Sequence, residues 1–357
     1  MSFRLVRLGL ADAAAAWRRP WPGVLCVAKI HSSSQRTLKY GLLAYWLGER
    51  TTKRFNERSK IFTVDGNLSC GKGKLAKQIA EKLGMVYVPE ADIHYADRIT
   101  GDGTLMDEKF NASCNMERFY NDPKSPDGHS YRLQAWLFGN RVLQYSNVLE
   151  LLLSTGQGVV MERSVYSDLV FMDAIFKQGY VHKRCVVHYN EMRRESIYEF
   201  LPPHLVIYID SPVSEVQKRL QEEGEPYEKK VSAAYLQSIE DSYKKKFLPE
   251  MSENCEVLHY TTSEAEDIEK VLEDIDYLKF DKGPWLEQDD VSFHHLRMFV
   301  ENKYEVLEAT ALPNYIPEIT ISGPEFNKLY YEYKSLPGHY YERGYNADMG
   351  DKWIWLK

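Results

Sequence analysis

The sequence lacks the residue patterns that build metal centres, disulfide frameworks and membrane spans. Its five cysteines are scattered and odd in number, and no CxxC pair or Cys/His cluster is present. We therefore expect no zinc site, no iron–sulfur cluster and no disulfide network, and reduced thiols suit a cytosolic or mitochondrial matrix compartment. No apolar run approaches the roughly 18 residues that cross a bilayer. Any membrane association is expected to come through partner proteins.

The sequence also lacks a surplus of positive charge. Its formal net charge is -7 over 357 residues, so a basic face for nucleic acid is not expected. The hydrophobic fraction of 44% and the charged fraction of 27% are typical of a globular protein. The length is ample for one large α/β domain with extensions, or for two domains.

The amino-terminal segment differs in charge from the rest of the chain. Basic residues recur before Gly48, at Arg4, Arg7, Arg18, Arg19, Lys29, Arg36 and Lys39. The only acidic residue there is Asp12, and residues 32–34 are serines. This composition is typical of a mitochondrial transit peptide, with a disordered basic tail as the alternative. We expect a transit peptide over residues 1–35, cleaved near residues 30–37, and a polar linker over 36–59.

Short apolar runs alternate with helical patterns between residues 60 and 280. Strands are expected at 61–65, 85–88, 159–161, 204–210 and 255–260, with a long helix over 131–153. This alternation predicts an α/β fold with a doubly wound parallel sheet of about five strands, covered on both faces. Ligands of such sheets bind at the carboxyl ends of the strands, so residues at those ends are candidates for a site.

The pattern changes over residues 281–357, where regular alternation stops. Aromatic residues gather there: Trp285, Tyr330, Tyr331, Tyr333, Tyr340, Tyr341, Tyr345, Trp353 and Trp355. We expect an irregular, aromatic-rich carboxyl-terminal extension. It either packs on its own domain or serves as a docking arm, because aromatic residues dominate interface energetics. The sequence favours neither alternative.

The turn after the first expected strand reads DGNLSCGKGK from Asp65 to Lys74. Gly66, four residues and then Gly71 and Lys72 match most of a phosphate-binding loop. Backbone N–H groups and the helix dipole of such a loop attract phosphate oxygens, and Lys72 would add a mobile positive charge. A glycine-rich turn without a ligand is the alternative. The candidate nucleotide-binding residues here are Gly66, Asn67, Gly71, Lys72, Gly73 and Lys74.

The loop departs from the motif at two positions. The residue after Lys72 should be Ser or Thr, whose hydroxyl binds Mg²⁺, but it is Gly73. Lys74 cannot replace that hydroxyl because an ammonium group repels a metal ion. Ser69 stands where relatives of the motif often carry another glycine. We expect phosphate binding without a dedicated metal site.

The stretch from Asp65 to Lys72 resembles the first motif of deoxynucleoside kinases, and three later segments match that family in order across residues 60–280. The resemblance implies a P-loop nucleoside-kinase-like fold and a nucleoside pocket. The residues that match the pocket motifs are Glu90, Gln134, Arg141, Arg163 and Asp168. In the family these positions hold the general base for the sugar hydroxyl, the base-reading glutamine with its neighbouring arginine, an arginine near the reacting phosphate and an acid near the nucleobase. Glu162 would lie near a metal ion.

The residues themselves support part of this interpretation. Glu90, Glu162 and Arg163 fall at the carboxyl ends of expected strands, where two carboxylates and a guanidinium can position a hydroxyl and stabilise charge. Solvated strand ends and a structural ion pair are the alternatives. Gln134 and Arg141 can equally form the polar edge of an amphipathic helix.

The lid segment at residues 218–226 also departs from the family. Arg219 is present, but acidic residues stand where further arginines are expected. Losing one such charge together with the metal-binding hydroxyl costs on the order of several kcal/mol of transition-state stabilisation. We therefore expect a pseudokinase that binds without useful turnover, in which Glu90 and Arg163 are vestigial catalytic residues.

The leader, the degraded loop, the Glu162-Arg163-Ser164 motif and the aromatic extension together resemble the kinase-like accessory subunits of mitochondrial NADH:ubiquinone oxidoreductase (complex I). The resemblance implies a peripheral position on the matrix side of the inner membrane, other complex I subunits as partners, and a role in assembly or stability. It also implies a possible purine nucleotide ligand, of the ATP or dNTP type or the ADP half of FAD. An active mitochondrial deoxynucleoside kinase and a free-standing nucleotide sensor are the alternatives.

Overall fold

A single parallel sheet forms the centre of the computed structural model, which describes residues 40–99, 103–336 and 339. Its five strands lie in the order β2-β3-β1-β4-β5, and every neighbouring pair is parallel. The strands are β1 (Ile61–Gly66), β2 (Val86–Val88), β3 (Val159–Glu162), β4 (Leu205–Asp210) and β5 (Glu256–Thr261). The expected α/β sheet is therefore confirmed.

The burial of the strands follows their position in the sheet. All six residues of β1 are buried, and β4 is buried except at its last residue. Strands covered on both faces need continuous apolar sequence, which these two have. The edge strand β5 is mostly half-exposed or exposed. The buried central strands hold their carboxyl ends, where the motif residues lie, in fixed positions.

The α-helices of the described residues are α1 (Leu42–Trp46), α2 (Lys72–Leu83), α3 (Tyr95–Ile99), α4 (Met116–Asn121), α5 (His129–Thr155), α6 (Leu169–Lys177), α7 (Lys183–Ile197), α8 (Val213–Glu223), α9 (Ala233–Ser242), α10 (Leu248–Asn254), α11 (Ile268–Asp276), α12 (Asp290–Glu301), α13 (Lys303–Glu308) and α14 (Gly323–Ser335). The shorter turns are η2 (Thr52–Arg54), η3 (Glu108–Asn111), η4 (Glu228–Lys230), η6 (Glu264–Glu266) and η7 (Pro284–Glu287), together with a π-helical turn, η5 (Tyr243–Phe247).

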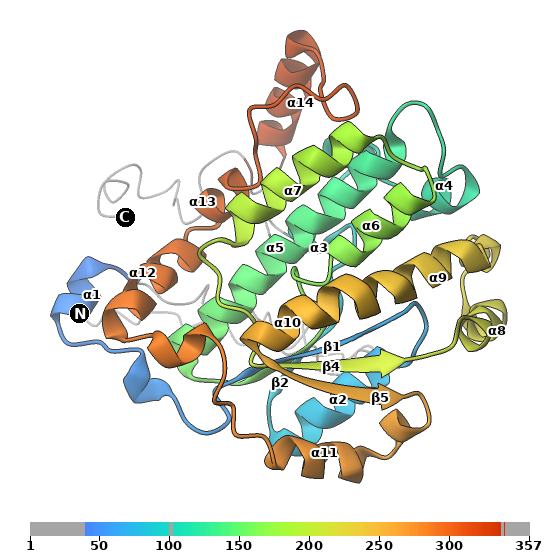
Figure 1. Cartoon of the computed structure of the whole chain (residues 1–357). Helices are drawn as coiled ribbons and strands as arrows, with labels where there is room; N and C mark the ends of the chain where they lie inside the picture. The colour runs from blue at the N-terminus through green and yellow to red at the C-terminus, as the bar shows by residue number, and fades with distance from the viewer. Residues whose placement is uncertain (1–39, 100–102, 337–338, 340–357) are drawn as a thin grey trace, which may run out of the picture.

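Helices cover both faces of the sheet. Figure 1 shows α2 and α11 on one face, and α5, α6, α7, α9 and α10 on the other. Each face has its own buried apolar cluster, the smaller one built on α2, α11 and residues of β1 and β4. The larger cluster is centred on α5. This two-sided arrangement is the layer architecture expected of alternating strands and helices.

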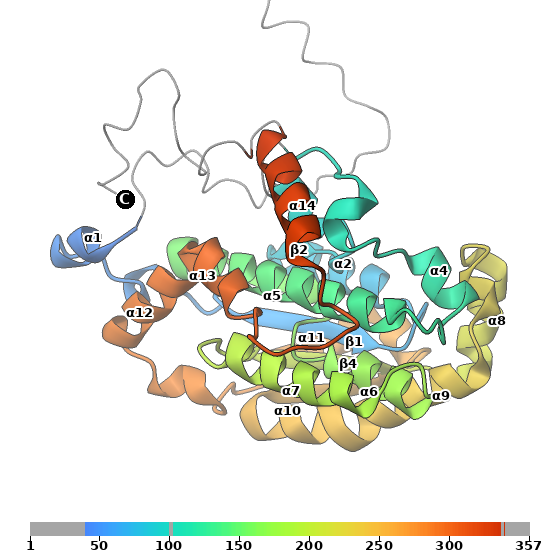
Figure 2. The ribbon, with the colours of Figure 1, turned by 90° about the horizontal axis from the view of Figure 1, so that it is seen from above.

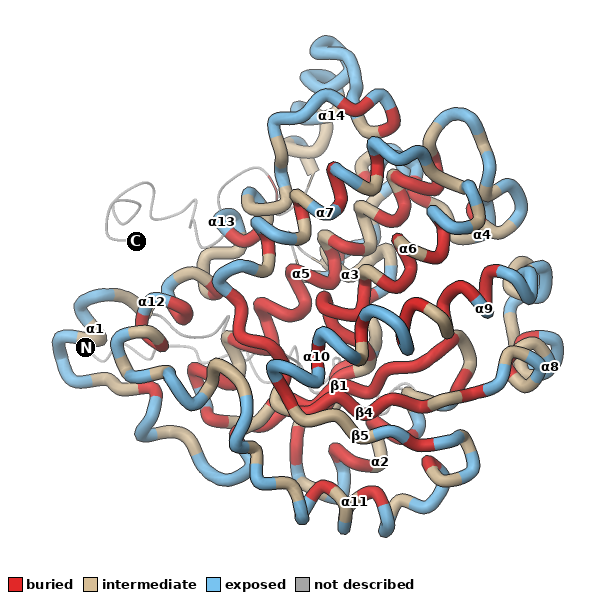
Figure 3. The backbone as a smooth tube through the Cα atoms, in the orientation of Figure 1, coloured by how far each residue is buried: buried red, intermediate tan, exposed pale blue. Residues whose placement is uncertain are grey.

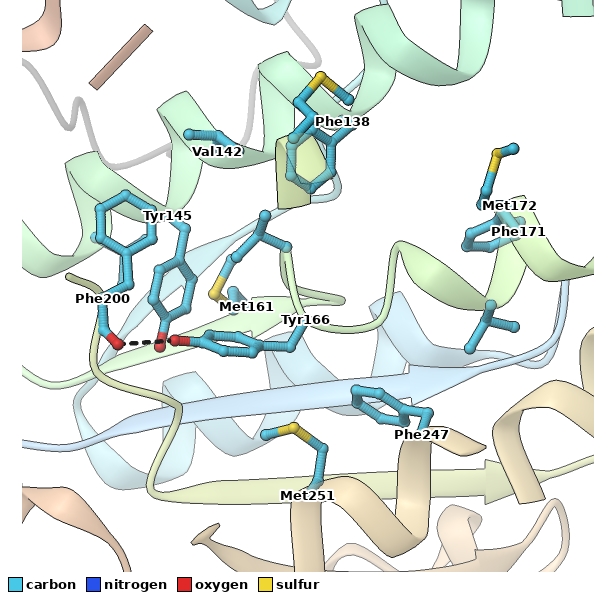
Figure 4. Close-up of a cluster of buried hydrophobic side chains, with 14 of the residues drawn as sticks. Phe138, Val142, Tyr145, Met161, Tyr166, Phe171, Met172, Phe200, Phe247 and Met251 are labelled. Atoms are coloured by element: carbon cyan, nitrogen blue, oxygen red, sulfur yellow. Dashed lines mark hydrogen bonds between the residues drawn. The ribbon is translucent and has the colours of Figure 1, made fainter. Parts of the chain in front are cut away.

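Helix α5 has 27 residues and passes through the middle of the larger cluster. Figure 3 shows it buried along most of its length. Figure 4 shows Tyr145 of α5 beside Tyr166, and both phenols find backbone partners: Tyr145 donates to the carbonyl oxygen of Leu201 at 2.7 Å and Tyr166 to that of Phe200 at 3.1 Å. Buried tyrosines of this kind need such acceptors. The helix therefore presents its motif residues from a rigid support.

The carboxyl-terminal extension is more regular than its sequence suggested. It contains α12 and α13, which pack along α5, and α14, which has no buried residue and projects from the body (Figure 2). Local caps start these helices: Asp289 and Ser292 form a capping box at α12, and Ser322 accepts from the backbone at the start of α14. The extension thus divides into an integral part and a peripheral helix. Residues 340–357, with Tyr340, Tyr341, Tyr345, Trp353 and Trp355, lie outside the described residues.

From residue 40 onward, the segment before β1 is packed on the body. The hydroxyl of Tyr40 lies 2.8 Å from Nδ1 of His294, and the guanidinium of Arg297 lies 3.7 Å from the centre of the Tyr40 ring. Arg297 is 1% exposed and also pairs with Glu49 at 2.8 Å. Residues 40–59 therefore pack against α12. The predicted transit peptide lies outside the described residues, and within those residues no helix is both long and apolar enough to cross a membrane.

Candidate functional site

The phosphate loop joins β1 to α2 in the strand–loop–helix arrangement that its motif requires. A Cβ on Gly66 would lie 2.8 Å from the carbonyl oxygen of Ile209, and Gly71 has a φ of +87°. Both positions therefore need glycine. Asn67 is buried, and its side-chain amide donates to the carbonyl oxygen of Leu236 at 3.1 Å. Asn67 thus anchors the loop to α9.

The basic side chains of the loop region differ in their partners. Nζ of Lys72 lies 3.3 Å from Oε2 of Glu90, whereas Lys74 is exposed on α2. Arg219 reaches the loop from α8, and its Nη1 lies 3.6 Å from the Cβ position of Gly71. Its Nη2 is held 2.6 Å from Oε1 of Glu215. The predicted lid arginine is therefore beside the loop, but an acidic neighbour on its own helix neutralises it.

Ser69 has the left-handed φ of +46°. This conformation explains why relatives of the motif often carry glycine at that position.

The space beside Gly73 is occupied by the carboxylate of Glu162. A Cβ on Gly73 would lie 2.7 Å from Oε1 of Glu162, and the hydroxyl of Tyr87 donates a short hydrogen bond to that same oxygen. Burial, and then the adjacent carboxylate, raise the pKa of Tyr87, so the phenol remains protonated as the donor. A Ser or Thr side chain does not fit at position 73 unless Glu162 moves. The carboxylate of Glu162 thus occupies the space that a hydroxyl-bearing side chain at position 73 would need.

Three positive charges surround Glu90 at the end of β2. Its Oε1 accepts from Nη2 of Arg141 at 2.9 Å, and its Oε2 contacts Nη1 of Arg163 as well as Lys72. Burial would raise the pKa of Glu90, but the positive charges of Arg163, Lys72 and Arg141 outweigh burial and hold this pKa well below its usual range. Glu90 is therefore a carboxylate at neutral pH and the link between the loop and the nucleoside motifs.

Asp168 completes the network below Arg141. Its Oδ1 pairs closely with Nη1 of Arg141, and its Oδ2 accepts from Nε2 of Gln134 at 2.8 Å and from the hydroxyl of Tyr189 at 2.6 Å. Asp168 is 0% exposed, and Gln134 and Arg141 are each 6% exposed. The structure therefore brings the five predicted nucleoside-pocket residues into one bonded group, which is buried except at Glu90, whose side chain is 24% exposed.

Arg163 connects this group to the loop backbone. Its Nη2 donates to the carbonyl oxygens of Gly66 at 2.9 Å and Asn67 at 3.3 Å. The residue has a φ of +55°, which is uncommon for a side chain of this size and is found in proteins mainly where the surroundings impose it. Its guanidinium lies 4.8 Å from the ring centre of Phe171, and that of Arg141 lies 5.2 Å from the same ring. Phe171 thus contacts both cations.

The structure adds residues that the sequence motifs did not indicate. Tyr243 lies in the π-helical turn η5, and its hydroxyl is 3.3 Å from Nε of Arg163 and 3.5 Å from Oδ1 of Asp65. Burial raises the pKa of Asp65, the residue that opens the loop motif. Tyr189 and Tyr87 also bond to motif carboxylates. Because Asp65 opens the loop motif, the sequence could have indicated that it belongs to the site. The three tyrosines belong to no sequence motif, so the sequence could not have indicated them.

A cavity of about 350 Å³ lies elsewhere, between residues 104–110 and α14. None of its lining residues belongs to a motif, and Lys109 pairs with Glu332 across it at 3.2 Å. Lys109 is therefore already neutralised. We assign the candidate site to the loop and its network, not to this cavity.

A parallel sheet, a phosphate loop after its central strand and a charged group at the neighbouring strand ends define a P-loop nucleoside-kinase-like protein. The chain belongs to the deoxynucleoside kinase family, whose model matches residues 62–280.

Among curated proteins, the chain is 57% identical over 357 residues to NADH dehydrogenase (ubiquinone) 1 alpha subcomplex subunit 10, mitochondrial, of Rattus norvegicus, covering 100% of both chains. It is 57% identical to the Bos taurus protein of that name, over 93% of this chain and 96% of that one. Deoxyguanosine kinase of Dictyostelium discoideum is 26% identical over 63% of this chain and 72% of its own. A solved deoxyadenosine kinase from M. mycoides with bound dATP matches 60% of this chain and 99% of that chain, with 16% identity and a TM-score of 0.48.

Proposed function

We propose that the chain is an accessory subunit of mitochondrial NADH:ubiquinone oxidoreductase, complex I, and supports the assembly or stability of that complex in respiratory electron transport. One observation carries this proposal: the 57% identity to the rat subunit runs over the whole chain, including both segments outside the kinase-family match at 62–280. The similarity to deoxyguanosine kinase covers only 63% of the chain. The extensions are thus shared with the subunits.

We propose further that the subunit does not catalyse phosphoryl transfer. That reaction depends on a positioned Mg²⁺ and on arginines that stabilise charge on the transferred group. Here the position of the metal-binding hydroxyl is Gly73, the adjacent space holds Glu162, and Arg219 is paired with Glu215. An enzyme of roughly 1–100 s⁻¹ that loses these elements becomes too slow to detect easily.

The proposed ligand is a purine nucleotide, either of the ATP or dNTP type or the ADP half of FAD, and the loop has features that suit its phosphate groups. The loop backbone and the start of α2 provide N–H donors, and Lys72 and Lys74 provide positive charge. Native mass spectrometry of the purified protein tests this ligand directly. A mass equal to that of the bare chain, after mild isolation with added ATP, would contradict nucleotide binding.

The competing function is an active deoxynucleoside kinase, which the retention of Lys72, Glu90 and Arg163 in one network favours. The decisive assay is phosphoryl transfer from ATP to a panel of deoxynucleosides. We expect no turnover above background. Turnover at ordinary kinase rates would overturn the proposal of a non-catalytic subunit.

The proposed location is the matrix side of the inner membrane, among other complex I subunits, and blue-native electrophoresis of mitochondrial extracts tests it. We expect the chain to comigrate with the complex, whereas a free-standing nucleotide sensor would migrate alone.

A truncation tests whether the extension docks on the complex. The truncation must spare α12 and α13, because these helices are packed on α5. Ending the chain after Ile321 removes α14 and the residues beyond this helix. Unchanged comigration of that variant would contradict a docking role for α14 and the segment beyond it.

A further inference from the structure

The short helix α1 and the residue after it carry the most exposed group of large apolar side chains near the amino-terminal end of the described chain. Leu42 is 52% exposed, Leu43 70%, Trp46 75% and Leu47 80%. We call these four residues the apolar peg. Figure 3 shows this part of the chain exposed, in contrast to the buried sheet. An exposed apolar group on a globular protein marks a contact with another protein or a membrane.

The peg is held by specific contacts on its inner side. The ring of Tyr45 lies 4.4 Å from that of His294, centre to centre. Nη1 of Arg50 donates to the carbonyl oxygen of Tyr45 at 2.6 Å, and the Arg50 guanidinium covers the Tyr45 ring at 4.1 Å. Tyr40, just before the helix, bonds to the same histidine. Tyr45 of the helix therefore faces α12, whereas the four residues of the apolar peg face solvent.

The chain that follows the peg is locally basic. Residues 49–60 contain five basic residues and two acidic ones, a surplus of three positive charges in a protein whose net charge is -7. Lys53 and Arg58 of this segment are exposed. Helix α14 provides the contrast, because it also exposes Phe326, Tyr330 and Tyr331, but its two lysines are balanced by two glutamates. Positive charge therefore accompanies the peg but not the exposed aromatic residues of α14.

We propose that the apolar peg inserts into the interfacial layer of an anionic phospholipid bilayer. Leucine and tryptophan partition into that layer, and nearby lysine and arginine are attracted to anionic headgroups. Five residues of helix are too short to span, so the contact is shallow. A protein partner would cover a wider area, about 800 Å² on each side. This contact adds a direct lipid anchor to attachment through partner proteins, and it does not depend on the proposed subunit role.

The test places an environment-sensitive NBD label on the peg of the full chain. Leu47→Cys is introduced together with Cys26→Ser, so that the label reaches position 47, since Cys70, Cys114, Cys185 and Cys255 are buried. The vesicles are phosphatidylcholine with and without cardiolipin. We expect the NBD emission to shift to the blue and to intensify with cardiolipin vesicles.

The matched control carries the label at Tyr331→Cys on α14, which has similar exposure and should show no spectral change. Because the label reports on its own position, binding of the basic leader to the vesicles does not shift the control.

A second measurement removes the peg without removing charge. Leu43→Ser combined with Trp46→Ser should weaken cosedimentation with cardiolipin vesicles by about tenfold. Thermal unfolding of this variant should match that of the parent, because both side chains are exposed. A label at position 47 that remains in water with every vesicle overturns the proposal. A shift that requires added inner-membrane protein also overturns it and identifies a protein partner instead.

Discussion

The phosphate-loop half of the site and the nucleoside half differ in how their charges are held. In the loop half, Lys74 is exposed, Arg219 forms an ion pair with the partly exposed Glu215, and Glu162 occupies the space beside Gly73. In the nucleoside half, Arg141 is bonded to both Glu90 and Asp168, and Asp168 is fully buried.

This difference explains why the two halves depart unequally from the family pattern. Replacing one member of a buried ion pair leaves the other charge without a partner, at a cost of about 3–5 kcal/mol. Replacing an exposed loop residue costs little stability. The nucleoside motif is therefore maintained by the fold itself, whether or not a reaction takes place. Retained motif residues are for this reason weak evidence of catalysis in this chain.

The largest expected effect comes from breaking the nucleoside half at Asp168. Asp168→Ala leaves Arg141 with only Glu90 and removes the acceptor of Tyr189. We expect the free energy of unfolding to fall by about 3–5 kcal/mol, measured by urea denaturation. The matched control is Glu215→Ala in the loop half, which should change it by less than about 1 kcal/mol. Equal losses in the two variants would refute the contrast between the halves.

The next effect depends on pH and concerns Glu90. Because the pKa of Glu90 is lowered in the folded state, its stabilising contribution is complete above the unfolded value of about 4.5 and is lost as the pH falls through the folded value. We expect Glu90→Gln to cost about 2 kcal/mol at pH 7. The free energies of unfolding of the variant and of the parent should approach each other when denaturation is repeated at steps below pH 4.5. A difference that stays constant down to pH 3 would mean that the charge of Glu90 is not its source.

A smaller effect is expected from restoring the loop hydroxyl. Gly73→Ser combined with Tyr87→Phe introduces the hydroxyl and removes the hydrogen bond that holds Glu162 over position 73. We expect ATP affinity to rise by roughly tenfold in the presence of Mg²⁺ and to stay unchanged without it, as measured by titration calorimetry. The control, Gly73→Ala with Tyr87→Phe, fills the same space without a metal ligand. If the ATP affinity of the alanine variant rises by the same factor, the increase comes from packing and not from a metal ligand.

The smallest effect concerns the lid. Glu215→Gln frees Arg219 from its ion pair, and we expect ATP affinity to rise by up to about threefold, with stability nearly unchanged. Glu222→Gln removes a carboxylate from the same helix, 4.0 Å from Lys218, and serves as the control. Equal gains in both variants would assign the effect to overall charge and not to Arg219.

Local sequence patterns were sufficient for the sheet and the loop. The strand expected at 204–210 is observed as Leu205–Asp210, and the loop lies between β1 and α2 as its motif required. The tyrosines of the site were not predictable in this way. Tyr243 meets Asp65 across 178 residues of sequence, and no periodicity or motif records such a pairing. The anchoring of residues 40–59 on α12 escaped prediction for the same reason, since it joins segments about 250 residues apart.

That anchoring has a consequence for the order of events as the chain is made. Tyr40 and His294 are 254 residues apart, so the contact between the amino-terminal segment and α12 cannot form until synthesis has passed α12. Contacts that bridge such a long loop form late, after local elements have assembled. A chain that ended before α12 would contain a complete sheet, but residues 40–59 would lack the helix against which they pack. Helix α1 at the amino-terminal end is therefore held in a fixed position only after α12 has been made and has folded.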